Sequence, residues 1–164
     1  METQQLITPA QLLEHWKGHR DLTRRVIEAF PEDKLLNYSI GGMRTFAQLA
    51  HELLDLADTG VQGMATGNWE SRPGMNHHKD SFTSKEALLA AWDETTKRID
   101  EIFPQMTDER WLQADKAFGQ FENTTIGTLM YFLDNENHHR GQGYVYLRSL
   151  GIEPPAFWDR VSLG

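Results

Sequence analysis

The segment DNENHHRGQGYVYLRSLG, residues 134–151, decides how the fold of this chain is interpreted. Apolar residues recur at helical spacing through it, and Gly151 follows the last of them, where a glycine commonly ends a helix. A helix is therefore predicted over about residues 125–150. Its middle is unusual, because a helix that must bury one face carries two adjacent histidines there, His138 and His139. The apolar stripe that defines the buried face consists of Ile126, Leu129, Leu133, Tyr144 and Leu147.

Three further helices are predicted by the same spacing of apolar residues. The first opens with Thr8 and Pro9, a favourable N-cap followed by a proline in the first turn. The third opens with a capping box formed by Thr83 and Glu86. Residues 112–125 lack helical spacing and are expected to be extended along the helices. The three helical segments run over residues 8–30, 45–64 and 83–103.

Four long helices with little strand predict an all-α fold, a four-helix bundle in a single domain that spans residues 1–164. The connection over residues 66–82 is polar and rich in turn residues, so it is predicted to be a long surface connection. The tail after the last helix contains two prolines and cannot continue it. We expect this tail to pack Phe157 and Trp158 against the domain.

Composition excludes several classes of protein. The net charge of −8 argues against nucleic-acid binding, which draws much of its affinity from Lys and Arg. No apolar run is long enough to predict a membrane-spanning helix. The N-terminal residues lack the pattern of a signal peptide, and the chain has no cysteine, so a cytoplasmic location is expected and disulfides and thiolate metal sites are excluded.

The seven histidines are the main reactive resource of the chain. His139 shares one edge of its helix with Asn135, one turn earlier, and His51 has Asp55 one turn later on its own helix. Taken alone, each histidine could be a metal ligand or an ordinary helix-packing residue, and the pattern leaves both interpretations open. His19 falls on the apolar stripe of the first helix and is predicted to point inward. His77 and His78 lie in the long connection and are interpreted as surface residues.

Three stretches carry a resemblance to a known family. They are TFAQLAHELLD (residues 45–55), NENHHRGQGYVYLRSLG (residues 135–151) and IEPPAFW (residues 152–158), and they resemble the DinB-like family, also called DinB/YfiT-like. The resemblance implies a four-helix bundle that holds a divalent metal, nickel or zinc, on three histidines. One of these comes from the second helix and two from the last helix, in the pattern His-x-x-x-His-Arg-Gly-Gln.

Carried over residue by residue, the metal ligands are His51, Asn135 and His139. Asn135 departs from the family pattern, which has a histidine there. Residues four apart on a helix can converge on one point, but an asparagine oxygen is a weak donor for nickel or zinc. Arg140 lies close to the centre of the buried face, and a buried guanidinium there requires a carboxylate partner. Gly141 and Gly143 lie inside the helix and are predicted to allow close helix packing.

Two functions follow from the resemblance. The first is a metal-dependent enzyme that acts on low-molecular-weight thiols, in S-transfer or isomerisation. The alternative is a degenerate, metal-free bundle that binds a small molecule or a partner without catalysis. The resemblance also implies a homodimer, while the family name, DNA damage-inducible, refers to induction and predicts no chemistry on DNA.

Overall fold

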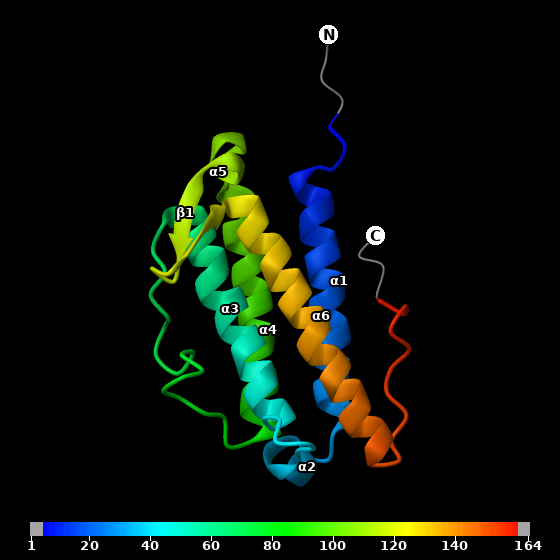
Figure 1. The fold of residues 1–164 in the computed structure, drawn as a ribbon. Coiled ribbons are helices and arrows are strands. Elements are labelled where there is room, and N and C mark those ends of the chain that lie inside the picture. Colours follow the sequence, from blue (N-terminus) through cyan, green and yellow to red (C-terminus); the bar gives the residue numbers. More distant parts are fainter. Residues whose placement is uncertain (1–4, 161–164) are drawn as a thin grey trace.

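The computed structural model describes residues 5–160, and most of this chain is helical. Four long helices lie side by side, and three short helical segments and one hairpin connect or cover them (Figure 1). The mostly helical fold predicted from the sequence is therefore confirmed. In chain order the elements are α1 (Pro9–Ala29), α2 (Glu32–Asn37), α3 (Phe46–Thr66), α4 (Lys85–Ile102), η1 (Phe103–Gln105), α5 (Asp108–Leu112), β1 (Ala114–Ala117), β2 (Phe121–Thr124) and α6 (Thr125–Ser149).

The ends of the long helices follow the capping residues of the sequence. Thr8 caps α1 as predicted, and its side chain accepts a hydrogen bond from the backbone of Gln11. At α4 the prediction was wrong by one residue, because Ser84 and not Thr83 is the N-cap. The side chain of Ser84 accepts a hydrogen bond from the backbone N–H of Ala87, so α4 begins one residue later than predicted.

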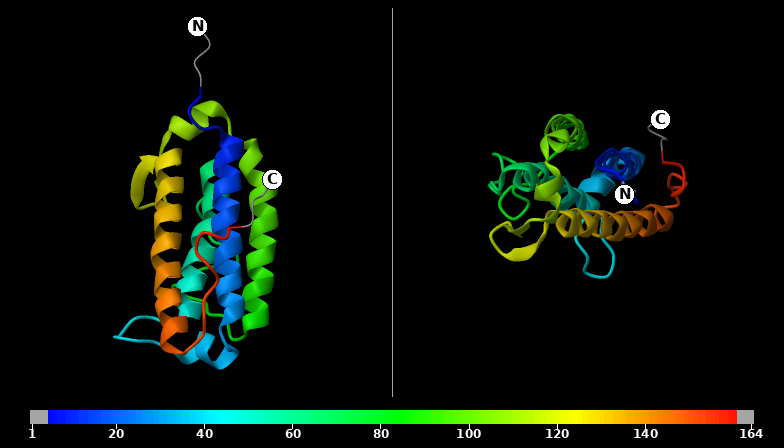
Figure 2. Two further views of the ribbon diagram at one scale, coloured as in Figure 1. Left: turned by 90° about the vertical axis from the view of Figure 1, so that its right-hand side faces the viewer. Right: turned by 90° about the horizontal axis from the view of Figure 1, so that it is seen from above.

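Helix α3 packs against both α4 and α6, and α1 closes the other side (Figure 2). Seen from above, α4 and α6 lie on opposite sides of the molecule with α1 and α3 between them. Two clusters of buried apolar side chains fill the space between the helices, one toward each end of the molecule. Nearly every residue of α3 outside its ends is buried, so its polar residues must find partners inside the protein.

Residues 112–125 contain the extended segment that the sequence predicted. Strands β1 and β2 pair antiparallel as a short hairpin, with Ala114 opposite Thr124 and Ala117 opposite Phe121. The hairpin lies along α3 and the first turns of α6 (Figure 1). It adds a two-stranded sheet to the all-α fold that we predicted.

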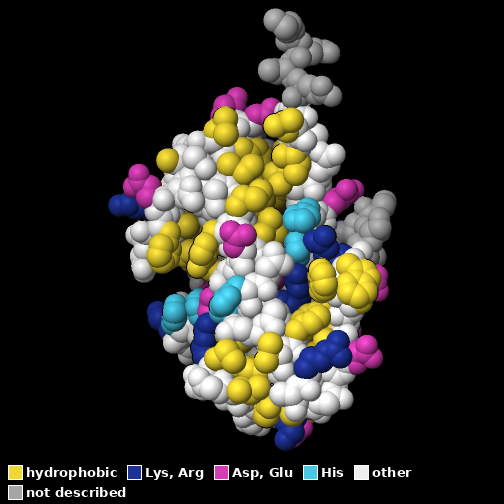
Figure 3. All heavy atoms as spheres, turned by 45° about the vertical axis from the view of Figure 1, so that its right-hand side comes forward, with side chains coloured by type: hydrophobic (Ala, Val, Ile, Leu, Met, Phe, Trp, Pro, Cys, Tyr) yellow, Lys and Arg dark blue, Asp and Glu magenta, His cyan; other side chains and the backbone are white. Residues whose placement is uncertain are grey.

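The C-terminal tail corrects another prediction. It turns back along α1 after Gly151, whose φ of 74° is the left-handed conformation expected of a glycine that ends a helix. Phe157 and Trp158 do not pack against the domain, since they are 67% and 74% exposed. Hydrophobic side chains gather in several patches on this face of the molecule (Figure 3). The tail contacts α1 instead through Arg160, whose guanidinium lies 2.8 Å from Nε2 of His19.

The two glycines inside α6 differ in what surrounds them. A Cβ atom at Gly143 would overlap the ring of Phe46 in α3, whereas a Cβ atom at Gly141 would meet nothing within 4 Å. Gly143 therefore permits the close approach of α3 and α6, as predicted, and Gly141 does not serve that purpose.

We expect Gly143→Ala to destabilise the protein by about 1–3 kcal/mol, because the added methyl group forces the helices apart. Gly141→Ala is the matched control and should stabilise by about 0.5–1 kcal/mol through the higher helix propensity of alanine. Urea denaturation of both variants measures the difference. Equal effects of the two substitutions would contradict the packing role of Gly143.

Within residues 5–160, no helix combines the length and the apolar character needed to cross a membrane.

Candidate functional site

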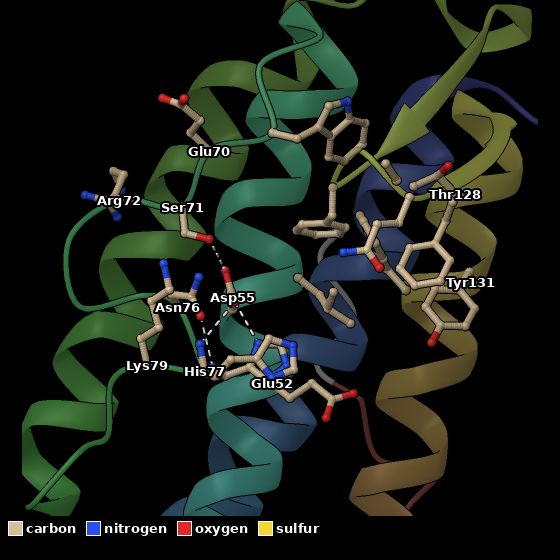
Figure 4. A pocket seen from close by; sticks show the side chains of 18 of the residues that line it. Glu52, Asp55, Glu70, Ser71, Arg72, Asn76, His77, Lys79, Thr128 and Tyr131 are labelled. Carbon is tan, nitrogen blue, oxygen red and sulfur yellow. Dashed lines mark hydrogen bonds and ion pairs between the residues drawn. The ribbon is translucent and has the colours of Figure 1, made fainter.

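A cavity of about 970 Å³ opens beside α3 (Figure 4). Its walls are α3, the segment of residues 67–84, the β1–β2 hairpin and the first half of α6. This volume lies in the range of about 300–1,000 Å³ that is usual for small-molecule sites. The wall toward the hairpin and α6 is largely aromatic, and the aromatic residues are Trp69, Phe118, Phe121, Tyr131 and Phe132.

Three carboxylates form a row along α3, at a spacing of three residues. Glu52, Asp55 and Asp58 lie on neighbouring turns of one helix face. Glu52 binds α6, and Asp55 binds the 67–84 segment. Asp58 binds both the 67–84 segment and α4. The row thus connects α3 to α6, to the 67–84 segment and to α4.

Glu52 is the centre of a polar cluster between α3 and α6. One carboxylate oxygen accepts from the side-chain amide of Asn135 at 3.1 Å and contacts Nε2 of His139 at 3.2 Å. The other forms an ion pair with Arg44 at 2.6 Å. Burial disfavours the charge of Glu52, but the hydrogen bonds from His139, Arg44 and Asn135 outweigh burial and hold the pKa of Glu52 well below its usual range.

His139 is fixed on both sides of its ring. Its Nδ1 donates to the amide oxygen of Gln142 at 2.7 Å, and its Nε2 faces Glu52. Burial lowers the pKa of His139, but the hydrogen bonds to Glu52 and Gln142 outweigh burial and raise that pKa above its ordinary value. These contacts favour the protonated ring over the neutral one.

The structure brings two of the three predicted metal ligands together. Asn135 and His139 share Glu52 as a partner, as the spacing of four residues predicted. His51 belongs to a different surrounding, since its Nε2 donates to the carbonyl oxygen of Met75 at 2.9 Å and its ring packs edge-on against Phe82. Burial lowers the pKa of His51, so its neutral form is favoured.

These residues do not fit a three-ligand metal centre as they stand. Nε2 of His51 carries the hydrogen that Met75 accepts, both ring nitrogens of His139 have partners, and the guanidinium of Arg44 adds positive charge beside Glu52. No group of three or more His, Cys, Asp or Glu side chains placed to hold a metal ion is found within residues 5–160. The ligand set of His51, Asn135 and His139 stays a prediction.

Asp55 binds the 67–84 segment through His77. Its Oδ2 accepts from Nδ1 of His77 at 2.7 Å and from the backbone N–H of His77 at 3.2 Å (Figure 4). Its Oδ1 accepts from Ser71 at 3.0 Å and from Thr59 at 2.9 Å. Burial opposes the charge of Asp55, but the hydrogen bonds from His77, Thr59 and Ser71 prevail and lower the pKa of Asp55.

The inward orientation predicted for His19 is found in the structure, and so is a carboxylate partner for Arg140. The guanidinium of Arg140 is buried and lies 4.0 Å from the carboxylate of Glu136. It also donates to Nδ1 of His19 at 3.0 Å and to the hydroxyl of Thr23 at 3.2 Å. This cluster joins α1 to α6 on the far side from the cavity, so it orders the helices and takes no part in the site.

Sequence reasoning missed two residues of the site, Glu52 and His77. The sequence assigns Glu52 no role at the site, and it places His77 among the surface residues. The spacing of the acids at positions 52, 55 and 58 is a signal that could have identified a polar face on a buried helix. Nothing in the sequence indicates that Asp55 pairs with His77, because 22 residues of irregular chain and helix separate them.

Comparison with known proteins gives one consistent result. The DinB family profile matches residues 1–161. The uncharacterized protein YjoA of Bacillus subtilis (strain 168) is 24% identical over 152 residues, which cover 92% of this chain and 97% of YjoA.

Two solved structures share the fold. A DinB-like protein from Bacillus cereus ATCC 10987 superposes with a TM-score of 0.70 at 18% identity, over 91% of this chain and 97% of the other. The solved structure of YjoA gives a TM-score of 0.70 at 23% identity, over 90% of this chain and 97% of that one.

Proposed function

This chain belongs to the DinB family, and from that premise we propose that it binds a small molecule in the cavity beside α3, without a three-histidine metal centre. Family membership also supports the finer description of α1, α3, α4 and α6 as a four-helix bundle. A side-by-side homodimer remains part of this proposal, and sedimentation velocity would test it.

One observation carries the proposal: the cavity combines a charged end with an aromatic wall. Glu52, Asp55 and Arg44 lie at the charged end, and Tyr131 and Phe132 belong to the opposite wall. Small-molecule sites commonly have this composition, in which a few polar groups orient a ligand and apolar rings supply contact area. The polar groups are held by hydrogen bonds before any ligand arrives, which lowers the cost of ordering them on binding.

The metal-free part of the proposal rests on Glu52. Its carboxylate already binds Asn135, His139 and Arg44, so the negative charge that would attract a cation is neutralised inside the protein. A divalent cation would have to displace Arg44 and His139 from Glu52 in order to bind there.

Binding of anilinonaphthalene sulfonate, an aromatic anion whose fluorescence rises in apolar sites, tests the proposal. Leu56 lines the cavity from α3, and Leu56→Trp should fill the space and weaken binding at least tenfold. Met130→Trp adds the same side chain on the exposed face of α6, where Met130 is 39% exposed, and should leave binding as in the wild type. Equal binding of the dye by the wild type, Leu56→Trp and Met130→Trp would contradict the proposal. A screen of small thiols, followed by displacement of the dye, then narrows the ligand class.

The competing proposal is the metal-dependent enzyme with nickel or zinc that acts on low-molecular-weight thiols. The observation in its favour is the convergence of Asn135 and His139 on one point next to Glu52. A bound divalent metal would lower the pKa of a thiol or of water and so supply a nucleophile at neutral pH.

We expect Asn135→His to raise the affinity for zinc or nickel about a hundredfold, from micromolar or weaker in the wild type. A second imidazole, one turn from His139 and beside Glu52, supplies a stronger donor than the asparagine oxygen. Titration calorimetry with each metal measures the change. Asp134→His places a histidine on the exposed side of the same helix and serves as the control.

Two results separate the proposals. Stoichiometric metal in the purified wild type, lost in both His51→Ala and His139→Ala, would favour the metal-dependent enzyme. Weak binding in the wild type and tight binding in Asn135→His would show that the scaffold can hold a metal that this sequence does not select.

A further inference from the structure

His77 lines the cavity, and its surroundings differ from those of His139. Its Nδ1 and its backbone N–H both donate to one oxygen of Asp55, at 2.7 and 3.2 Å. Two bonds to one buried carboxylate fix the position and the orientation of the ring (Figure 4). The ring also lies against the ring of His78, with the two centroids 3.9 Å apart and the ring planes at 39°.

The carboxylate decides which nitrogen of His77 carries the proton. An ionised Asp55 can only accept, so Nδ1 of His77 must be the donor and Nε2 keeps its lone pair in the neutral ring. No residue of the described chain forms a hydrogen bond to this Nε2, while the His77 side chain lines the cavity. A basic nitrogen of fixed orientation is thus left for a bound molecule.

Ser71 completes the cluster without being a nucleophile. Its hydroxyl donates to Asp55 at 3.0 Å, and not to Nε2 of His77, as a serine of a Ser-His-Asp triad would. Thr59 donates to the same oxygen of Asp55 at 2.9 Å from inside α3. Ser71 and Thr59 therefore hold the carboxylate, and the cluster offers a base but no side-chain nucleophile.

We propose that His77, positioned by Asp55, is a catalytic base that activates water against a carboxylic ester with an aromatic leaving group bound in the cavity. This proposal rests on the proposed binding function of the cavity. The aromatic wall formed by Trp69, Tyr131 and Phe132 takes the leaving group, and the acyl carbon then faces the polar end where His77 lies.

The step balances with water as the only co-reactant. Nε2 of His77 takes a proton from water, the water oxygen bonds to the acyl carbon, and the carbonyl electron pair moves onto its oxygen. The carbonyl then re-forms, the bond from carbon to the leaving oxygen breaks, and that oxygen takes the proton from Nε2. Lys79, two residues after His77, also lines the cavity and forms no ion pair within the described chain, so its ammonium can stabilise the developing oxyanion.

Hydrolysis of p-nitrophenyl acetate by the purified wild-type protein tests the proposal. His77→Gln keeps the size of the side chain and should lower kcat about a hundredfold with little change in KM, since a positioned base contributes about 10²–10⁴-fold. His138→Gln removes an exposed histidine of α6 outside the cavity and should hydrolyse at the wild-type rate. A His77→Gln rate equal to that of the wild type, or no wild-type hydrolysis above that of free imidazole, would overturn the proposal.

Asp55 is a positioning residue, and nitrogen NMR of the imidazole gives it a separate readout. In the wild type, Nδ1 of His77 should show the shift of a protonated nitrogen and Nε2 that of an unprotonated one. Asp55→Asn should lose this tautomer preference together with at least tenfold in kcat. Observation of a protonated Nε2 in the neutral wild-type ring would exclude the base role even before any kinetics.

The dye experiment keeps the two proposals apart. Binding that Leu56→Trp abolishes, without hydrolysis that depends on His77, would leave the binding function intact and remove the catalytic inference. Hydrolysis that persists in Leu56→Trp at the wild-type rate would place the reaction outside the cavity and overturn the inference as well.

Discussion

Asp58→Ala is expected to destabilise the protein by about 3–5 kcal/mol, the range found when one partner of a buried ion pair is removed. The Asp58 side chain is 0% exposed and forms a two-point ion pair with Arg72, with N–O distances of 2.8 and 2.5 Å. Thr95 in α4 donates to it at 2.9 Å, and Arg98 lies 3.2 Å away. Without the carboxylate, the partly buried guanidinium groups of Arg72 and Arg98 lose the negative charge that they share, and Arg72 keeps only its more exposed partner Glu94.

Asp93→Ala is the matched control for this prediction. Asp93 forms the same two-point ion pair with Arg24, at 2.6 and 2.9 Å, but its side chain is 46% exposed. Exposed pairs contribute about 0–1 kcal/mol because water and salt screen them. Chemical denaturation of both variants should separate them by at least 2 kcal/mol. Similar losses in the two would mean that burial does not decide the contribution of these pairs.

Asp58 also makes the free energy of unfolding depend on pH. Burial penalises its charge, but the hydrogen bonds from Arg72 and Thr95 and the charge of Arg98 outweigh burial and lower the pKa of Asp58. Since the folded pKa lies below the unfolded value of about 3.9, its contribution is complete well above pH 4 and is lost as the pH falls through the folded pKa. Unfolding free energies measured between about pH 3 and pH 7 should therefore fall less steeply for Asp58→Asn than for the wild type at the acid end of this range.

Trp92→Ala is expected to cost about 3–5 kcal/mol, the usual loss when a buried aromatic side chain is truncated. Trp92 in α4 is 1% exposed, and its indole N–H donates to the carbonyl oxygen of Arg20 at 3.1 Å. The guanidinium of Arg20 lies 4.3 Å from the centre of the ring and donates back to the Trp92 carbonyl at 3.0 Å. The substitution therefore leaves a cavity in the core. It also removes the aromatic ring from the buried guanidinium of Arg20, which has no access to water in exchange.

Trp158→Ala provides the comparison, because Trp158 is 74% exposed. Its removal should change the unfolding free energy by about 0.5 kcal/mol or less. Calorimetric unfolding of the two variants tests the pair. A loss at Trp158 as large as that at Trp92 would indicate that the aromatic tail is covered in solution, as a dimer interface would require.

Much of the fold could be predicted from the sequence, because local signals determine it. The spacing of apolar residues located the four long helices, and Gly151 located the end of the last one. The start of α4 was misplaced since Thr83 and Ser84 are both good N-caps, and only the backbone geometry shows which one is used. The exposed tail was missed because prolines predict where a helix stops, but not where the following chain goes.

The candidate site was predictable only in part, for a physical reason. Asn135 and His139 lie four residues apart on one helix, so their common orientation followed from helical spacing. Neighbouring residues of α3 face different directions, and the choice between His51 and Glu52 as the partner of α6 depends on how α3 is rotated about its axis. That rotation is set by long-range packing, such as the contact of Phe46 with Gly143. The pairing of His77 with Asp55 depends on the path of a long irregular segment, which no spacing rule predicts.

The row of carboxylates on α3 has a consequence for how the chain assembles. The partners of Asp58 and Asp55 are near in sequence: Arg72 is 14 residues from Asp58, and His77 is 22 residues from Asp55. The partners of Glu52 on α6 are far away, with Asn135 at 83 residues and His139 at 87 residues. Closing a short loop loses less chain entropy than closing a long one, so contacts that are near in sequence tend to form first. We expect α3 and the 67–84 segment to come together early in folding, and α6 to dock late. The wall made by α3 and the 67–84 segment would then form before the wall made by α6. The last step of folding would also be the step that encloses the cavity.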